Sequence, residues 1–181
     1  MYTEWIAIHC RSKTTMPLGV DGDHRFRVYP GTRMHEALRD GDILLLLQPR
    51  DPILYAESVF HRLEHRLDWA TGCPPAGKPE GLWYACRASY TGVDEHGARW
   101  YTCKWMRRLA GEPPAYTRPY GCLVEALVAY TKLRAGIPVP GERGYIEGLK
   151  WCVERGSRGD RRLLASMHEV LQRIQEVLGE G

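Results

Sequence analysis

Residues 118–141 read RPYGCLVEALVAYTKLRAGIPVPG, and the rest of the chain is interpreted outward from this stretch. Its apolar residues recur at helical spacing, which predicts a buried helix over residues 122–134 that ends before Gly136. Cys122 then stands in the first turn, where the positive end of the helix dipole favours a thiolate, the nucleophilic form of cysteine. The alternative is that Cys122 packs as a small buried apolar residue at the start of the helix.

The composition is that of an ordinary globular protein of 181 residues, with 44% hydrophobic and 26% charged residues. A net charge of +3 is too small to indicate a dedicated nucleic-acid binder. No apolar run approaches the roughly 18 residues of a membrane span, so no membrane partner is expected. The N-terminus lacks the charged segment and long apolar core of a signal peptide. This predicts a cytoplasmic protein, or one carried in a virus particle.

The sequence contains six cysteines, and no two of them form a Cys-x-x-Cys pair. This spacing argues against a zinc ribbon and against a thioredoxin-like redox site, so reduced and mostly buried thiols are expected. Asparagine is absent and arginine greatly outnumbers lysine, which favours a thermophilic source over a GC-rich genome as the cause. One or two disulfides would be expected only if that source is hyperthermophilic.

Hydrophobic periodicity predicts an α+β fold, in which a small, mainly antiparallel sheet packs against about three helices. Strands are expected at residues 3–10, 24–29 and 43–47, and a hairpin at residues 82–93 and 98–105. The three main helices are expected near residues 53–70, 122–134 and 160–178, with a shorter one at residues 145–154. Proline and glycine predict loops at residues 11–23 and 71–81.

A single α+β domain is predicted over residues 1–156, followed by a C-terminal amphipathic helix within residues 157–181. Asp160 is a suitable N-cap for this helix, and two adjacent apolar rows follow it. We expect the helix to pack on its own domain, because an exposed apolar stripe of this width promotes aggregation. A role in docking a protein partner is the alternative.

Two segments resemble one known family. Residues 38–45, LRDGDILL, are similar to a Gly-Asp turn that enters a buried strand, and residues 120–127, YGCLVEAL, are similar to a nucleophile helix, followed by Ala-Gly-Ile-Pro. Over residues 36–140 this layout resembles the circularly permuted papain-like cysteine hydrolases of the NlpC-like superfamily. The resemblance implies a thiol hydrolase that acts on an amide or peptide bond, such as a cell-wall peptide, with Cys122 as the nucleophile.

The sequence departs from that family at two positions. Leu123 takes the place of the usual small hydroxyl residue after the cysteine, and the strand that begins at Gly81 carries no histidine to serve as the base. A thiol without a base is a poor nucleophile at neutral pH. We therefore assign the role of base to His65, with His61 as the alternative, and leave open whether the site is active.

A second motif, His61-Arg62-Leu63-Glu64-His65, spells the H-x-x-E-H signature of inverted zinc peptidases. Two histidines four residues apart on a helix can hold one metal ion, and the intervening glutamate can act as the base. However, the apolar face of the expected helix lies about 190° from both histidines, so they should point to solvent. A zinc metallopeptidase is therefore an alternative function, and no metal is expected.

The rival class is a non-catalytic structural or adaptor protein of a phage or host assembly. Its contact surfaces would be the C-terminal helix and the Trp- and Tyr-rich hairpin. The sequence has no phosphate-binding glycine loop, so no cofactor is expected. The expected partners are thus a peptide or amide substrate, or a protein bound through the C-terminal helix.

Overall fold

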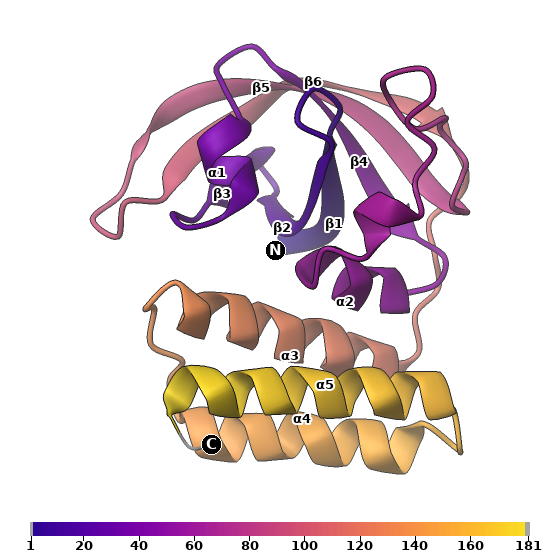
Figure 1. Ribbon diagram of the computed structural model, residues 1–181, viewed down its shortest axis with the longest axis vertical. Helices are drawn as coiled ribbons and strands as arrows, with labels where there is room; N and C mark the ends of the chain where they lie inside the picture. Colours follow the sequence, from indigo (N-terminus) through magenta and orange to yellow (C-terminus); the bar gives the residue numbers. More distant parts are fainter. Residues whose placement is uncertain (1, 180–181) are drawn as a thin grey trace. The chain divides into compact units, whose positions relative to one another are not determined.

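The computed structural model describes residues 2–179 and divides the chain into two compact units, residues 1–114 and 115–181 (Figure 1). Within the described residues, the first unit contains all the strands and two short helices, and the second contains three longer helices. The predicted α+β class with a mainly antiparallel sheet is confirmed. The boundary expected between residues 156 and 157 lies inside the second unit.

The elements of the first unit are β1 (Tyr2–His9), β2 (Thr14–Asp21), β3 (Arg25–Val28), α1 (Arg33–Ala37), β4 (Ile43–Pro49), α2 (Ile53–Val59), a 3-10 turn (Leu63–His65), β5 (Gly81–Val93) and β6 (Arg99–Ala110). The strands expected at residues 3–10, 24–29 and 43–47, and the hairpin, are confirmed with small shifts at their ends.

The six strands form one sheet in the order β2-β1-β4-β5-β6-β3, and every neighbouring pair is antiparallel. The two edge strands, β2 and β3, follow one another in sequence. The turn between them is tied to β6 by a hydrogen bond from Cys103 N to His24 O, 2.9 Å long. β2 and β3 also contact each other, and the sheet curls into a nearly closed barrel (Figure 1).

The strand β2 was not predicted, because Pro17 and Gly19 made residues 11–23 resemble a loop. In the structure Pro17 lies opposite Ile6 of β1, in an unbroken antiparallel register. The reason is that β2 is an edge strand. At every second position of an edge strand the backbone N–H points away from the sheet. A proline at such a position removes no hydrogen bond of the sheet.

Side chains that alternate along the strands fill the interior of the barrel. Leu44 and Leu46 of β4 lie in this core beside Trp5 and Phe26, and all four are at most 6% exposed. Leu45 and Leu47, on the opposite face of β4, are also buried. This confirms the expectation of a strand that is buried on both faces.

The helix expected at residues 53–70 is much shorter in the structure. It ends at Val59, and His61 follows in the left-handed region with a φ of 58°. Arg62 N donates to Glu57 O, and His61 N donates to Ser58 O, which is the hydrogen-bond pattern of a Schellman motif. The chain therefore leaves the helix direction before it reaches the H-x-x-E-H motif.

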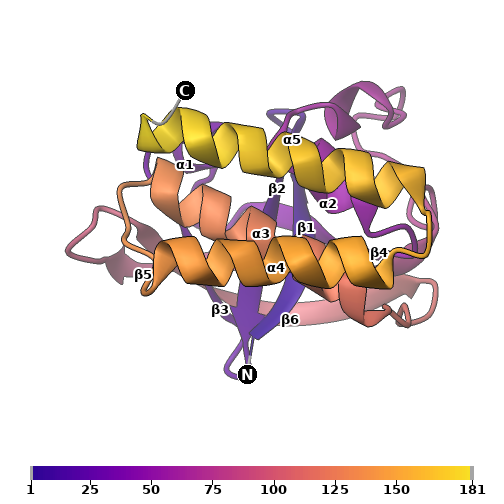
Figure 2. The same cartoon turned by 90° about the horizontal axis from the view of Figure 1, so that it is seen from below.

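The second unit consists of α3 (Arg118–Arg134), α4 (Glu142–Gly156) and α5 (Arg161–Leu178), which confirms the three helices expected there (Figure 2). α3 packs against both α4 and α5, and α4 also contacts α5. Asp160 caps α5 as expected, because its Oδ1 accepts hydrogen bonds from Arg162 N and Leu163 N at 3.0 and 3.1 Å.

The six cysteines form three disulfides: Cys10–Cys73 and Cys86–Cys103 in the first unit, and Cys122–Cys152 in the second. The expectation of reduced thiols is therefore wrong. Sequence spacing could not reveal these pairs, since their members stand 63, 17 and 30 residues apart and meet only through folding.

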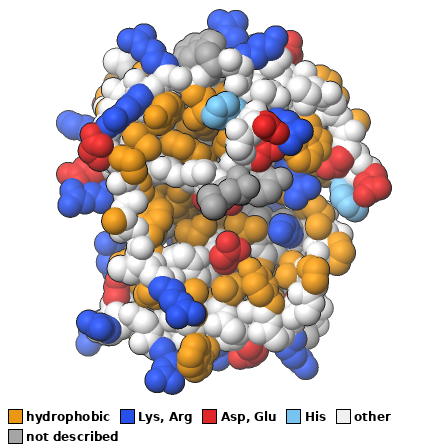
Figure 3. Space-filling view, turned by 180° about the vertical axis from the view of Figure 1, so that it is seen from behind, with side chains coloured by type: hydrophobic (Ala, Val, Ile, Leu, Met, Phe, Trp, Pro, Cys, Tyr) orange, Lys and Arg blue, Asp and Glu red, His pale blue; other side chains and the backbone are white. Residues whose placement is uncertain are grey.

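On the face of the molecule shown in Figure 3, basic side chains lie scattered among acidic and hydrophobic ones. Among the large hydrophobic side chains that the structure describes, Val93 and Trp151 are the most exposed, at 60% and 58%. Among the helices of residues 2–179, none combines the length and the apolar character that a membrane crossing requires.

Candidate functional site

Five of the six buried polar residues in the described chain gather around the start of β2. They are 1–8% exposed: His9, Thr14, Thr15, Ser58 and Glu64. We call this group the buried polar cluster. Polar side chains in an apolar interior need partners, because each unpaired group costs free energy. Their concentration at one point of the first unit marks it as the candidate functional site.

Glu64 is the charged member of the cluster. Its Oε1 accepts hydrogen bonds from Thr15 N at 3.1 Å and from His61 Nδ1 at 3.3 Å, and Arg33 Nη1 lies 3.7 Å away. Its Oε2 is fully buried and has no hydrogen-bond partner among the described residues. One oxygen of this carboxylate is thus held in place, while the other is buried without a hydrogen-bond partner among the described residues.

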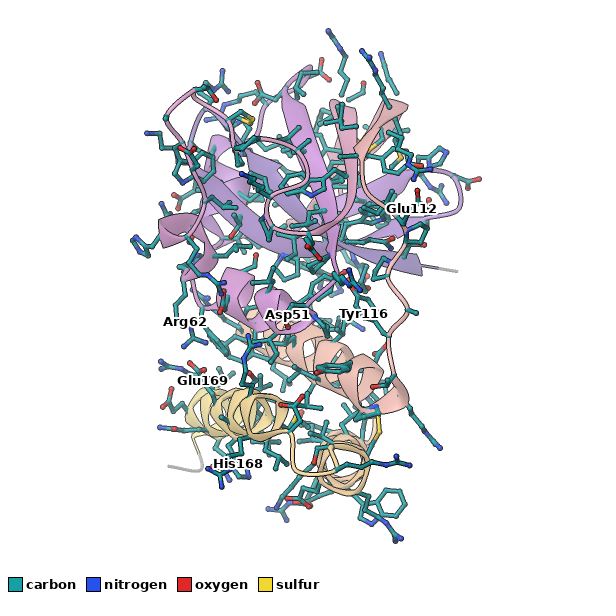
Figure 4. All side chains as sticks on the ribbon, turned by 90° about the vertical axis from the view of Figure 1, so that its right-hand side faces the viewer. Asp51, Arg62, Glu112, Tyr116, His168 and Glu169 are labelled. Carbon is teal, nitrogen blue, oxygen red and sulfur yellow. A yellow bond between two sulfur atoms is a disulfide. The ribbon has the colours of Figure 1, made fainter. Side chains whose placement is uncertain are left out.

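The fold holds this carboxylate inward from two sides. Ser58 Oγ, from α2, donates to Thr15 Oγ1 at 3.1 Å, which ties α2 to the start of β2. Trp69 Nε1 donates to Glu64 O at 2.8 Å and fixes the backbone of the 3-10 turn. Figure 4 labels Asp51 and Arg62, which lie before and after α2 and so mark the ends of the segment that carries Ser58.

The cluster reaches the surface through two basic side chains. The side chain of Arg33 is 54% exposed and that of His61 is 41% exposed, while the side chain of Glu64 beside them is only 7% exposed. Arg33 begins α1, and Thr32 Oγ1 caps this helix by accepting from His35 N at 3.1 Å. A cation at the surface and a carboxylate beneath it can bind a ligand that carries both an anionic group and hydroxyl groups.

A second branch of the cluster runs from Thr14 to His9. Thr14 Oγ1 and Ser12 Oγ lie 2.8 Å apart, and Ser12 Oγ lies 2.7 Å from His9 Nδ1. His9 Nε2 lies 3.2 Å from Asp42 Oδ2, which also accepts from Arg39 N. Burial lowers the pKa of His9 below its usual value, although the Asp42 carboxylate acts in the opposite direction. His9 is therefore neutral at neutral pH.

This branch leads to a prediction of pH-dependent stability. Since the pKa of His9 is lower in the folded state than in the unfolded state, the unfolded state binds the proton more readily. The free energy of unfolding should therefore keep its full value above about pH 6.5 and fall as the pH decreases below it. The measurement is urea unfolding at about pH 7.5 and pH 5, compared with His9→Gln, which keeps hydrogen-bonding groups but does not titrate. The wild type should lose more stability on acidification than the variant. Equal losses would show that the charges around His9, on Asp42, Arg11 and Arg39, cancel its effect.

The two residues assigned to catalysis from the sequence do not form the expected site. Cys122 is bonded to Cys152 in the second unit, and a sulfur in a disulfide is not a thiolate nucleophile. His65 lies in the 3-10 turn of the first unit, where its side chain is exposed. The expected position of Cys122 in the first turn is also wrong, because α3 begins at Arg118, and the disulfide partner of Cys122 stands 30 positions away in the sequence.

The zinc alternative is also wrong, because it assumed a continuous helix through His61, Glu64 and His65. The left-handed residue His61 and the short 3-10 turn that follows remove the geometry of two histidines one helical turn apart. Among residues 2–179, no group of three or more His, Cys, Asp or Glu side chains is placed to hold a metal ion. Within this motif, Glu64 and His61 contact each other, as members of the candidate site described above.

The comparisons with known proteins point to a different fold. The chain is similar to the crystal structure of an FMN-bound protein from Methanosarcina mazei, assigned to the family DUF447, with a TM-score of 0.63 and 15% sequence identity. The similarity covers 95% of this chain and 94% of that chain, and at this identity it shows a shared fold. No protein-family model and no curated protein matches the sequence.

This fold overturns the papain-like resemblance. The Gly-Asp turn and the Cys122 helix are real elements, but they belong to a barrel and a helical unit like those of an FMN-bound protein. The interpretations as a thiol hydrolase, a thiol protease or a zinc metallopeptidase are corrected accordingly, and the adaptor alternative gains no support. Sequence reasoning missed Thr15, Ser58 and Arg33, since hydroxyl and arginine side chains spaced this widely form no motif. The one signal was Glu64, which the H-x-x-E-H pattern singled out for a different chemistry.

Proposed function

We propose that the first unit binds flavin mononucleotide (FMN) at the buried polar cluster. The observation that carries this proposal is the buried Glu64 Oε2 without a partner, beside the exposed Arg33. The similarity in fold to an FMN-bound protein supports it. The sequence predicted no cofactor, because the site uses no glycine loop; its polar groups come from β2, α1, α2 and the 3-10 turn.

The residues present fit the two polar parts of FMN. The ribityl chain carries hydroxyl groups, and a carboxylate oxygen such as Glu64 Oε2 accepts a hydrogen bond from a hydroxyl. The phosphate is an anion, and the guanidinium of Arg33 is a suitable partner because it can donate two parallel hydrogen bonds. His61, which is partly exposed, contacts Glu64 Oε1 through its Nδ1 and so helps to hold the carboxylate at this point.

When bound, FMN supplies hydride and single-electron transfer chemistry. The chain's own part is to bind and orient it. Thr15 N and His61 Nδ1 hold Glu64 Oε1, so the carboxylate cannot turn freely. Ser58 fixes the position of Thr15 in turn. A carboxylate that is already held loses little conformational entropy on binding, which favours affinity.

The test is titration of the purified protein with FMN and with riboflavin, which lacks the phosphate, followed by flavin fluorescence. We expect FMN to bind with a Kd on the order of micromolar or tighter. Glu64→Ala should weaken both ligands by about 10- to 100-fold, because a hydrogen bond to a charged group contributes about 1.5–3 kcal/mol. Arg33→Ala should weaken FMN by a similar factor and leave riboflavin unchanged.

Glu80→Ala is the matched control for Glu64→Ala, because Glu80 is a carboxylate of the same unit whose side chain is 76% exposed. It should leave both affinities unchanged, and thermal unfolding should confirm that each variant is folded. The proposal is contradicted if the wild type binds neither flavin, or if Glu64→Ala binds both as tightly as the wild type does. Equal weakening of FMN and riboflavin by Arg33→Ala would remove the assignment of Arg33 to the phosphate.

A further inference from the structure

The outer face of α4 carries an exposed aromatic residue between two opposite charges. The inner face is defined by Leu149 and Val153, which are 9% and 0% exposed. At 100° per residue, Trp151 projects about 160° from each of them, and it is 58% exposed. Glu147 and Arg155 stand four residues before and after Trp151, so the three side chains form one row along the exposed side of the helix.

This row is complementary to itself. If two copies of α4 cross antiparallel with the two-fold axis at Trp151, Glu147 of each copy faces Arg155 of the other, and the two indoles meet on the axis. The guanidinium of Arg155 already lies over the ring of Trp151, 5.0 Å from its centroid. The two-fold axis generates the Glu147–Arg155 pair twice. One substitution that reverses the charge of either residue would therefore make both contacts repulsive.

The backbone beside Trp151 also permits close approach. Gly148 lies on the same side of the helix, and a Cβ built on it would meet nothing within 4 Å. Side chains that project from a second helix can therefore come near the backbone of α4 at this point. Exposed Trp and Arg are the residues most enriched where proteins bind one another.

We propose that α4 is a self-association surface, which pairs antiparallel with α4 of a second copy of this chain through Trp151, Glu147 and Arg155. The area that the interface buries limits the affinity of the dimer. A helix of 15 residues is about 22 Å long, so a single helix pair buries less than about 1,200 Å² in total. Interfaces of this size are weak and transient, and the dimer should form only as the protein concentration rises.

Sedimentation or light scattering at increasing concentration tests the proposal. The average mass should rise from 20.7 kDa towards twice that value by a concentration on the order of 0.5 mM. Glu147→Arg alone and Arg155→Glu alone should each abolish the rise, because like charges then face each other across the axis. The double variant Glu147→Arg/Arg155→Glu should restore it. Trp151→Ala should weaken the dimer by at least about tenfold.

Glu95→Arg is the matched control, since it makes the same change in net charge at a side chain that is 86% exposed in the first unit. It should associate like the wild type. A wild type that stays monomeric at the highest concentration overturns the proposal. The proposal also fails if the dimer survives both single reversals, or if the double variant stays monomeric. All four substituted positions are exposed, so the variants should fold, and circular dichroism checks this.

Discussion

Replacement of Cys10 and Cys73 by serine should lower the free energy of unfolding of the first unit by about 4 kcal/mol. The disulfide between them closes a segment of 63 residues, and its loss returns that conformational freedom to the unfolded chain. At about 2–4 °C per kcal/mol for a chain of this size, the melting temperature should fall by roughly 8–16 °C. Thermal unfolding followed by circular dichroism, without reductant, measures the difference.

The double variant Cys122→Ser/Cys152→Ser is the matched comparison in the second unit. Its disulfide spans 30 residues, which gives a slightly smaller expected loss of about 3.5 kcal/mol. Iodoacetamide should label no cysteine in the folded, non-reduced wild type, since all six sulfurs are paired. Rapid labelling of Cys122 under these conditions, with no loss of stability in either double variant, would mean that the disulfides do not form.

Gly111→Ala should destabilise the protein by more than about 4 kcal/mol. A single substitution causes a loss of this size only when it creates a severe steric or packing fault. Gly111 has a φ of +77°, and a Cβ built on it would lie 1.7 Å from the carbonyl oxygen of Gly81. That oxygen belongs to the backbone of β5, so it cannot move aside as a flexible side chain would. The first unit would have to shift its β5–β6 pairing to accept a single methyl group.

Gly97→Ala separates this collision from the cost of a positive φ. Gly97 has nearly the same φ, +76°, but a Cβ there would meet only Pro30 Cγ at 3.8 Å, which is an ordinary contact. The cost at Gly97 should be about 1–2 kcal/mol, the penalty of the left-handed conformation alone. Chemical unfolding of both variants gives the two values. Similar losses at the two positions would contradict the close approach of Gly111 to Gly81.

The contrast between Cys122 and Glu64 explains why the candidate site could not be predicted from the sequence. The helix expected at Cys122 exists, but it begins at Arg118, so Cys122 lies beyond its first turn, and a disulfide partner removes the thiol chemistry. The local signal at Glu64 was the H-x-x-E-H motif, which requires an α-helix, whereas the structure has a short 3-10 turn there. The place of Glu64 in the candidate site depends on contacts with Thr15, which lies 49 residues earlier, and with Arg33.

The sequence by itself determined the elements whose signals are local. The five-residue apolar run became β4, the Gly97 turn produced the β5–β6 hairpin, and Asp160 capped the amphipathic α5. Alternation, turn chemistry and capping act between residues within about one turn or one strand. These signals can therefore be recognised without knowledge of the fold.

The tertiary structure alone decided three further features. It made β2 an edge strand, where Pro17 is harmless. It paired the six cysteines, and it gathered the buried polar cluster at the start of β2. Each of these depends on contacts between residues that are distant in the chain. Such contacts form only when apolar faces are buried within each unit, and no short segment of the sequence records which residues that burial will bring into contact.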